Sequence, residues 1–196
     1  MIEVMPKKVD HQERRTRIAD ALMRVAADQG LEAVSLRHVA AQAGVSAGMV
    51  QHYFRTKDEM MAFALAVVRE RSQIRVTEAV ERLGPDPSPR LLLRTMIAAL
   101  LPLDERTRDD GRVALAFLAY TAVRPAAASG LHEDTVQLIG FIAGLLPPPN
   151  ADAAAAGLLA LMEGLGIYLL GGQYTAAQAL SALDAQLDLL FGVDGA

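Results

Sequence analysis

Residues 47 to 53, AGMVQHY, place small side chains at one end of a short stretch and hydrogen-bonding side chains at the other. Gln51, His52 and Tyr53 supply amide, imidazole and phenol groups, which can reach phosphate oxygens and base edges. A helix that sits in a major groove needs a narrow leading end, and Ala47 and Gly48 provide one. The chemistry that this order favours is recognition of double-stranded DNA rather than bond making or breaking.

Signatures of catalysis are missing from the sequence. The four histidines, at positions 11, 38, 52 and 132, lack the spacing of paired metal ligands, and phosphate-binding Gly-rich loops and nucleophile elbows are not found. Glu163 is a single carboxylate in an apolar stretch, and one carboxylate is not a catalytic site. Cysteine is absent, which excludes thiolate ligands and favours a reducing cytoplasm. We therefore expect no catalytic residue, no metal and no cofactor.

A helix, a short turn and a second helix must position residues 47 to 53. Ser35 is a predicted N-cap for a helix that ends at Gly44, where a left-handed conformation is needed. Ser46 then caps the helix that starts at Ala47. Two helices joined by a turn of this length and composition are typical of the helix-turn-helix motif.

The rest of the chain also reads as helix, and alternation of the β type is hard to find, so the predicted class is all-α. The segment Thr56-Lys57-Asp58-Glu59 has the form of a capping box, and so has Thr175-x-x-Gln178. Besides the two helices of the motif, the expected helices span residues 10–29, 57–83, 89–101, 106–124, 132–146, 151–170 and 175–191.

Charge is distributed unevenly along the chain. Residues 1–57 carry nine Lys/Arg against six Asp/Glu, whereas residues 58–196 carry ten against seventeen. A local excess of positive charge by itself is common on solvated helices, but it agrees with a DNA-binding N-terminal end. We expect a three-helix DNA-binding domain over residues 1–57 and a second, helical domain over residues 58–196.

The stretch from Ile18 to Met60 resembles the DNA-binding domain of the TetR family of bacterial repressors. The resemblance rests on Ser35-Leu36-Arg37, Ala43-Gly44-Val45-Ser46, His52-Tyr53-Phe54 and Lys57-Asp58-Glu59-Met60 at fixed spacing. The segments HYFRTKDEM and MEGL…LLGGQYTAAQALSALDAQL are similar to the BetI-like branch. The resemblance implies a cytoplasmic repressor that binds a palindromic operator as a homodimer and is released by a small-molecule effector. The alternative is a helical protein-interaction module that has lost DNA binding.

The resemblance also implies roles for single residues. Arg37 matches a position that reaches a base edge, Met49 is placed to contact a thymine methyl group, and Tyr53 and Lys57 match phosphate-contacting positions. Many family members have Tyr where this chain has Gln51, so a contact by that ring is lost and an adenine contact becomes available. The predicted DNA-binding residues are Arg37, Ser46, Ala47, Gly48, Met49, Gln51, His52, Tyr53 and Lys57.

Simpler interpretations remain open for several of these positions. Tyr53 could be a packing residue with its hydroxyl in water, and His52 a surface histidine. Arg14, Arg15 and Arg17 could be solvated helix charges or part of an arm near the DNA backbone.

The last two helices are rich in leucine and are expected to form the dimer interface, in addition to filling the core of each subunit. The tract 153–170 contains Glu163 and several glycines, so a buried or interface helix explains it better than a membrane span.

A quaternary ammonium effector, which the BetI-like resemblance suggests, would need an aromatic cage, and the chain has no Trp and 5% aromatic residues. An apolar or amphipathic effector is an equal alternative. The candidate pocket residues, each of which could instead be core, are Met96, Phe117, Tyr120, Phe141, Met162 and Tyr168.

Overall fold

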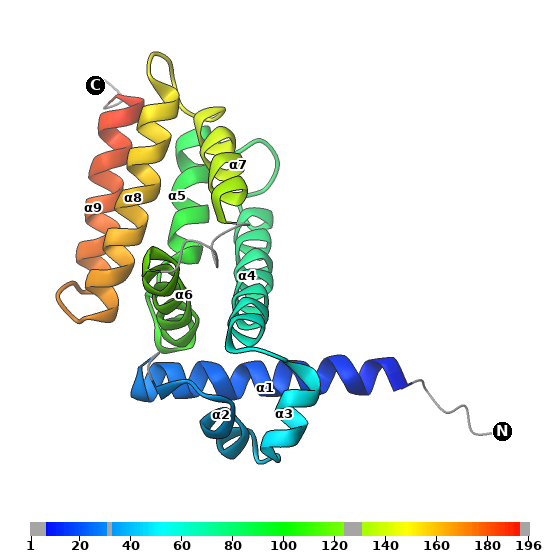
Figure 1. Ribbon diagram of the computed structural model, residues 1–196. Helices are drawn as coiled ribbons and strands as arrows, with labels where there is room; N and C mark the ends of the chain where they lie inside the picture. Colours follow the sequence, from blue (N-terminus) through cyan, green and yellow to red (C-terminus); the bar gives the residue numbers. More distant parts are fainter. Residues whose placement is uncertain (1–6, 31–32, 124–130, 193–196) are drawn as a thin grey trace. The chain divides into compact units, whose positions relative to one another are not determined.

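The computed structural model describes residues 7–30, 33–123 and 131–192, and throughout these ranges the regular elements are α-helices (Figure 1). The predicted all-α class is confirmed. The predicted helices agree with the observed ones except at their ends; for example, the helix expected to reach Leu146 stops at Ala143, and Arg124 lies outside the described residues. The helices are α1 (Lys7–Gln29), α2 (Leu36–Ala43), α3 (Ala47–Tyr53), α4 (Lys57–Glu81), α5 (Pro89–Leu100), α6 (Glu105–Val123), α7 (Leu131–Ala143), α8 (Ala151–Leu170) and α9 (Ala176–Phe191).

Contacts between residues divide the chain into two compact units. Unit 1 draws on Met1–Glu70 and Arg112–Tyr120, and unit 2 on Arg71–Gly111 and Thr121–Ala196. The division passes through α4 and α6. Residues of these two helices therefore take part in both units.

Unit 1 is built around the apolar stripe of α1. Ile18, Leu22 and Val25 are buried, α2 packs against α1, and α3 packs against α2. Val39 from α2 and Val50 from α3 are completely buried, because each lies on the inward face of its helix. The apolar stripe of α1 therefore supports α2, and α2 in turn supports α3.

The start of α4 carries a capping arrangement that differs in one bond from the predicted box. The hydroxyl oxygen of Thr56 accepts the Glu59 backbone N–H at 3.1 Å, as a capping box requires. The Glu59 carboxylate accepts a backbone N–H at 2.9 Å from Arg55, one residue before the cap. The carboxylate therefore also fixes the turn between α3 and α4.

Unit 2 has a core of aliphatic side chains from α5, α7, α8 and α9. The α7 helix packs on α8, and α9 packs on both α8 and α5. The predicted capping box at the start of α9 is present, with the Thr175 side chain and the Gln178 side chain bonding reciprocally to backbone N–H groups. The buried residues of this core are Leu93, Ile97, Leu101, Ile142, Leu146, Ala155, Leu158, Leu165, Leu169, Ala179, Leu183 and Leu187.

Ion pairs of Arg90 and Arg94 with Asp184 and Asp188 join α5 to α9 within unit 2. Arg94 donates through Nε to Asp184 Oδ1 at 2.6 Å and through Nη2 to Oδ2 at 3.0 Å, and Arg90 donates through Nε to Asp188 Oδ1 at 2.9 Å. The hydrogen bonds from Arg94 hold the pKa of Asp184 below its usual range, against an opposing effect of burial. The same bonding raises the pKa of Arg94.

Another charged cluster joins α4 to α6 in the same unit. Asp110 is 6% exposed, and its carboxylate accepts from Arg75 at 2.7 Å and from Arg71 at 3.4 Å. Arg75 also donates to Ser72 Oγ at 2.9 Å. A buried carboxylate is tolerated only when it is paired in this way, so the cluster fixes the position of α6 against α4.

Candidate DNA-binding surface and apolar cavity

The turn between α2 and α3 has the geometry that a helix-turn-helix requires. The Ser35 hydroxyl oxygen accepts the His38 backbone N–H at 3.2 Å and begins α2. Gly44 ends α2 with φ of 68°, in the left-handed region, and the Ser46 hydroxyl oxygen accepts the Met49 backbone N–H at 3.1 Å to begin α3. The three residues predicted to shape the turn therefore do so.

The outer face of α3 presents the residues predicted to read DNA. Gly48, Gln51 and His52 are exposed, and Ala47, Met49 and Tyr53 are half-buried. The opposite face is anchored, because Val50 and the C-cap residue Phe54 are fully buried. The His52 ring meets the Tyr53 ring edge to face, with centroids 5.3 Å apart. The exposed side of this seven-residue helix thus carries Gly48 near its beginning and Gln51 and His52 near its end, and the half-buried residues flank that side.

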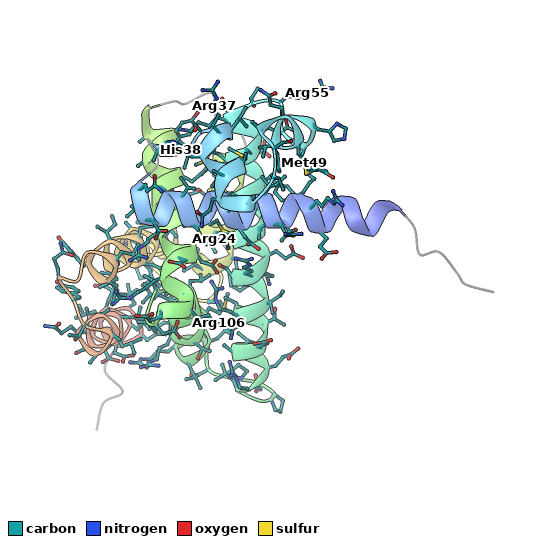
Figure 2. All side chains as sticks on the ribbon, turned by 90° about the horizontal axis from the view of Figure 1, so that it is seen from below. Arg24, Arg37, His38, Met49, Arg55 and Arg106 are labelled. Atoms are coloured by element: carbon teal, nitrogen blue, oxygen red, sulfur yellow. The ribbon has the colours of Figure 1, made fainter. Side chains whose placement is uncertain are left out.

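Residues from the neighbouring helices flank α3. Arg37 is exposed in the first turn of α2, and Lys57 is half-buried as the first residue of α4. Ser46 acts as the N-cap of α3, so its hydroxyl has a structural task in addition to the predicted DNA contact. Figure 2, seen from below, labels Arg37, Met49 and Arg55 on this part of unit 1.

Sequence reasoning omitted two exposed polar residues near this surface. Arg55 is exposed in the turn between α3 and α4, between Tyr53 and Lys57 in the chain. His38 is exposed on α2, and its Nδ1 lies 2.6 Å from the carbonyl oxygen of Ala33 (Figure 2). Arg55 directly follows His52-Tyr53-Phe54 in the sequence, and this position could have placed it among the predicted DNA-binding residues.

A small apolar cavity lies inside unit 2, between α5, α7 and α8. Its volume is about 20 Å³, roughly the room that one water needs. Two predicted pocket residues, Met96 and Met162, line it together with aliphatic residues. The lining consists of Leu93, Met96, Ile97, Leu100, Leu138, Ile142, Leu158, Leu159 and Met162.

The other four predicted pocket residues are not among those that line this cavity. Phe117 and Tyr120 belong to unit 1, where Phe117 is buried and the Tyr120 hydroxyl donates to the carboxylate of Asp58. Phe141 on α7 and Tyr168 on α8 are exposed, and the Tyr168 ring packs on that of Tyr174 at 4.9 Å. In a helix as apolar as α8, the sequence does not mark which side faces inward, so the predicted set mixes inner and outer positions.

Acidic and imidazole groups do not gather into a metal site. Within residues 7–30, 33–123 and 131–192, no group of three or more His, Asp or Glu side chains is placed to hold an ion. Glu163, the carboxylate noted in the apolar tract, is exposed on α8.

Comparison with known families gives two matches that together span both units. The family described as bacterial regulatory proteins, tetR family, matches residues 18–63. The family described as BetI-type transcriptional repressor, C-terminal, matches residues 89–192.

Individual proteins are similar over nearly the same range. The HTH-type transcriptional regulator PksA of Bacillus subtilis is 33% identical, covering 84% of this chain and 82% of that protein. The HTH-type transcriptional regulator BetI of Burkholderia thailandensis is 31% identical, covering 95% and 97%. A crystal structure of a transcriptional regulator from Rhodococcus sp. Rha1 is 37% identical with a TM-score of 0.80, covering 90% and 95%.

Proposed function

Because this chain belongs to the TetR family of transcriptional regulators, with a BetI-type C-terminal region, we propose that it is a repressor that binds a palindromic operator as a homodimer and is released by a small-molecule effector. Regulators of this family are DNA-binding proteins and not enzymes. Operator binding places the protein in the cytoplasm. We propose that residues 1–57 bind DNA and that residues 58–196 bind the effector and form the dimer.

The observation that carries the DNA-binding proposal is the shape and chemistry of α3. Its first residues are small and its last residues are hydrogen-bonding, and Gly48, Gln51 and His52 among them are exposed while Val50 and Phe54 are buried. In the major groove, Gln51 would meet a base edge, while Tyr53 and Lys57 would meet phosphates. Arg37 suits bidentate pairing with guanine.

The dimer proposal is supported by the outer face of α8 and α9. By length and composition α8 could cross a membrane, with a mean hydropathy of 1.8, yet only 28% of it is buried inside the subunit. Ile167 and Tyr168 are each about half exposed, and Leu189 is 78% exposed. Burial of these side chains against a second copy would remove apolar surface from water. A palindromic operator requires such a pairing, because its two half-sites present successive major grooves roughly 34 Å apart.

The leucines of α8 and α9, which were expected both to fill the core and to form the dimer interface, divide between the two roles. Several of them are fully buried within the subunit and cannot meet a partner: Leu158, Leu165, Leu169, Leu183 and Leu187. The proposed interface therefore uses the residues on the opposite side of the same two helices.

For the effector, the cavity between α5, α7 and α8 favours a neutral apolar molecule over a quaternary ammonium cation. Its lining consists of Leu, Ile and Met side chains and offers neither a carboxylate nor an aromatic face to a cation. A volume of about 20 Å³ is far below the roughly 300 Å³ or more of ordinary ligand pockets. An effector of ordinary size that enters here requires a state in which these helices have separated, and preferential binding to that state would shift the population away from the DNA-binding one.

DNA binding is tested with the duplex upstream of the protein's own gene. We expect Arg37→Ala and Tyr53→Ala to weaken binding, the first by about 1–3 kcal/mol with relaxed base preference at one position of each half-site. Unchanged affinity in both variants would favour a helical interaction module that does not use α3 for DNA.

Titration of the protein–DNA complex with medium-chain aliphatic alcohols and with choline tests the effector class, since only the alcohols should release DNA.

A further inference from the structure

Arg15 of α1 differs from the solvated helix charge that its sequence position suggests. Its guanidinium carbon lies 4.4 Å from the centroid of the Phe63 ring and 5.1 Å from that of Phe54. Its Nε is buried and has no hydrogen-bond partner in the described part of the chain. The cation is thus held by two aromatic faces, whose negative quadrupoles attract it.

One ring lies at the end of α3, the helix proposed to bind DNA, and the other lies on α4, the helix that follows it. Phe54 is the C-cap of α3, is fully buried, and donates its backbone N–H to the Val50 carbonyl at 2.9 Å. Phe63 lies on α4, and the two ring centroids are 5.4 Å apart. A single cation from α1 therefore joins the end of α3 to the beginning of α4.

A helix of seven residues depends on such anchors, because isolated helices of this length are not stable in water. Ser46 and Val50 fix its first turns. At its end, the position of Tyr53 is set by the neighbouring Phe54, and the position of Phe54 by its contacts with Arg15 and Phe63. A guanidinium is broader and less strongly hydrated than the ammonium of a lysine, so it suits a site between two rings better.

We propose that Arg15 is a positioning residue for DNA recognition, acting through Phe54 and Phe63 on the end of α3 rather than through contact with a phosphate. This inference rests on the proposed DNA-binding function. With Arg15 in place, α3 is already ordered before it binds the operator, so the free energy of ordering α3 is not subtracted from the free energy of binding. A dimer contains two copies of Arg15, so this effect on affinity applies twice.

The test uses the full-length protein and a duplex selected from a random-sequence pool by the wild type. Arg15→Gln should weaken binding about tenfold, because the cation is lost from both half-sites. The dependence of affinity on salt should stay as in the wild type, since no phosphate contact is removed. The DNA affinity of Arg15→Lys should lie between that of the wild type and that of Arg15→Gln. Arg24→Gln is the matched control, with the same charge change at an exposed site on the same helix (Figure 2), and should bind as the wild type does.

Amide hydrogen exchange without DNA supplies the second readout. Exchange at Val50 and Phe54 should be faster in Arg15→Gln than in the wild type and unchanged in Arg24→Gln. A fall in the salt dependence by about 0.9 for each lost phosphate contact would overturn the proposal in favour of a direct contact. The proposal would also be overturned if amide exchange in α3 were the same in Arg15→Gln as in the wild type. Failure of the wild type to select any duplex would contradict the proposed function, while exchange would still decide whether Arg15 anchors α3.

Discussion

Two glycines four residues apart serve α3 in different ways. Gly44 has φ of 68°, and a Cβ there would meet no atom within 4 Å, so its requirement is one of backbone conformation. Gly48 lies inside the first turn of α3, where a Cβ would approach only Ser46 Oγ at 4.0 Å. The fold therefore needs glycine at the first position but not at the second, and we attribute glycine at the second to the proposed DNA contact.

We predict opposite effects on stability from alanine at these two positions. Gly44→Ala should lower the free energy of unfolding by about 1–2 kcal/mol, because a left-handed alanine is strained. Gly48→Ala should raise it by about 0.5–1 kcal/mol, because alanine is the better helix former. Urea unfolding measures both.

The same Gly48→Ala protein should nevertheless bind operator DNA less tightly, because the added methyl group widens the leading end of α3. Fluorescence anisotropy with a labelled duplex measures the change. Wild-type affinity in this variant would mean that the beginning of α3 does not enter a groove.

At the scale of elements, α5 has two faces with different partners. Leu93, Met96 and Ile97 line the apolar cavity, whereas Arg90 and Arg94 pair with aspartates of α9. An effector that separates α5 from α7 and α8 would therefore act on a helix that is also bonded to the proposed dimer helix. The ion pairs link the two functions of unit 2.

The Arg94 pair should give stability a defined dependence on pH. The folded state holds the pKa of Asp184 below its unfolded value, mainly through the hydrogen bonds from Arg94. The stabilisation is therefore fully present above the unfolded carboxyl pKa of about 3.9, and it is lost as pH falls through the lower folded value. Asp184→Asn should cost about 1 kcal/mol at pH 7, the scale of a partly exposed pair.

Unfolding of the wild type and of Asp184→Asn, measured from pH 7 down to pH 3, checks this expectation. The difference in unfolding free energy should narrow below about pH 4. Glu78→Gln, at an exposed site on α4, serves as the control for loss of a surface carboxylate. A difference that stays constant over the whole range would mean that the charge of Asp184 is not what stabilises the α5–α9 contact.

Local features of these elements could be predicted from the sequence, and distant ones could not. The caps at Ser35, Ser46 and Thr175 and the turn at Gly44 involve residues within a few positions of each other, so their spacing identifies them. Arg94 and Asp184 are 90 residues apart, and their pairing depends on how helices pack. The contact of Arg15 with the rings of Phe54 and Phe63 was not predicted, because it also joins residues that are far apart in the sequence.

The predicted pocket shows a different limit. Phe141 and Tyr168 were grouped with Met96 because all are apolar residues in the C-terminal helices. Their exposure was not predicted, because helices that are apolar on most sides give no clear inward direction.

At the scale of the whole molecule, the chain is acidic, with a formal charge of −4, although it belongs to a family of DNA-binding regulators. Positive charge is concentrated in residues 1–57, so attraction to DNA depends on local placement rather than on net charge. The proposed palindromic operator requires two copies of α3, because one seven-residue helix contacts only one half-site. In the proposed dimer, the exposed face of α8 and α9 therefore contributes to the affinity for DNA.

Leu189→Glu tests this link. A charge at a side chain that is 78% exposed in the subunit should leave the fold intact but oppose burial in a dimer. We expect sedimentation to show a shift from dimer to monomer, with DNA affinity reduced about a hundredfold as the second half-site is lost. Val136→Glu is the matched control, at a 55% exposed position on α7, and should remain dimeric. A dimeric Leu189→Glu protein would place the interface elsewhere.

If α3 and its flanking residues bind operator DNA, as we claim, binding to the duplex should depend strongly on salt. For the wild type, log affinity should fall linearly with log salt, with a slope of roughly 0.9 for each neutralised phosphate. In Lys57→Ala the slope should decrease by about 0.9 per subunit, because one phosphate contact is removed from each. Absence of binding at low salt, or affinity that does not change with salt, would contradict the claim.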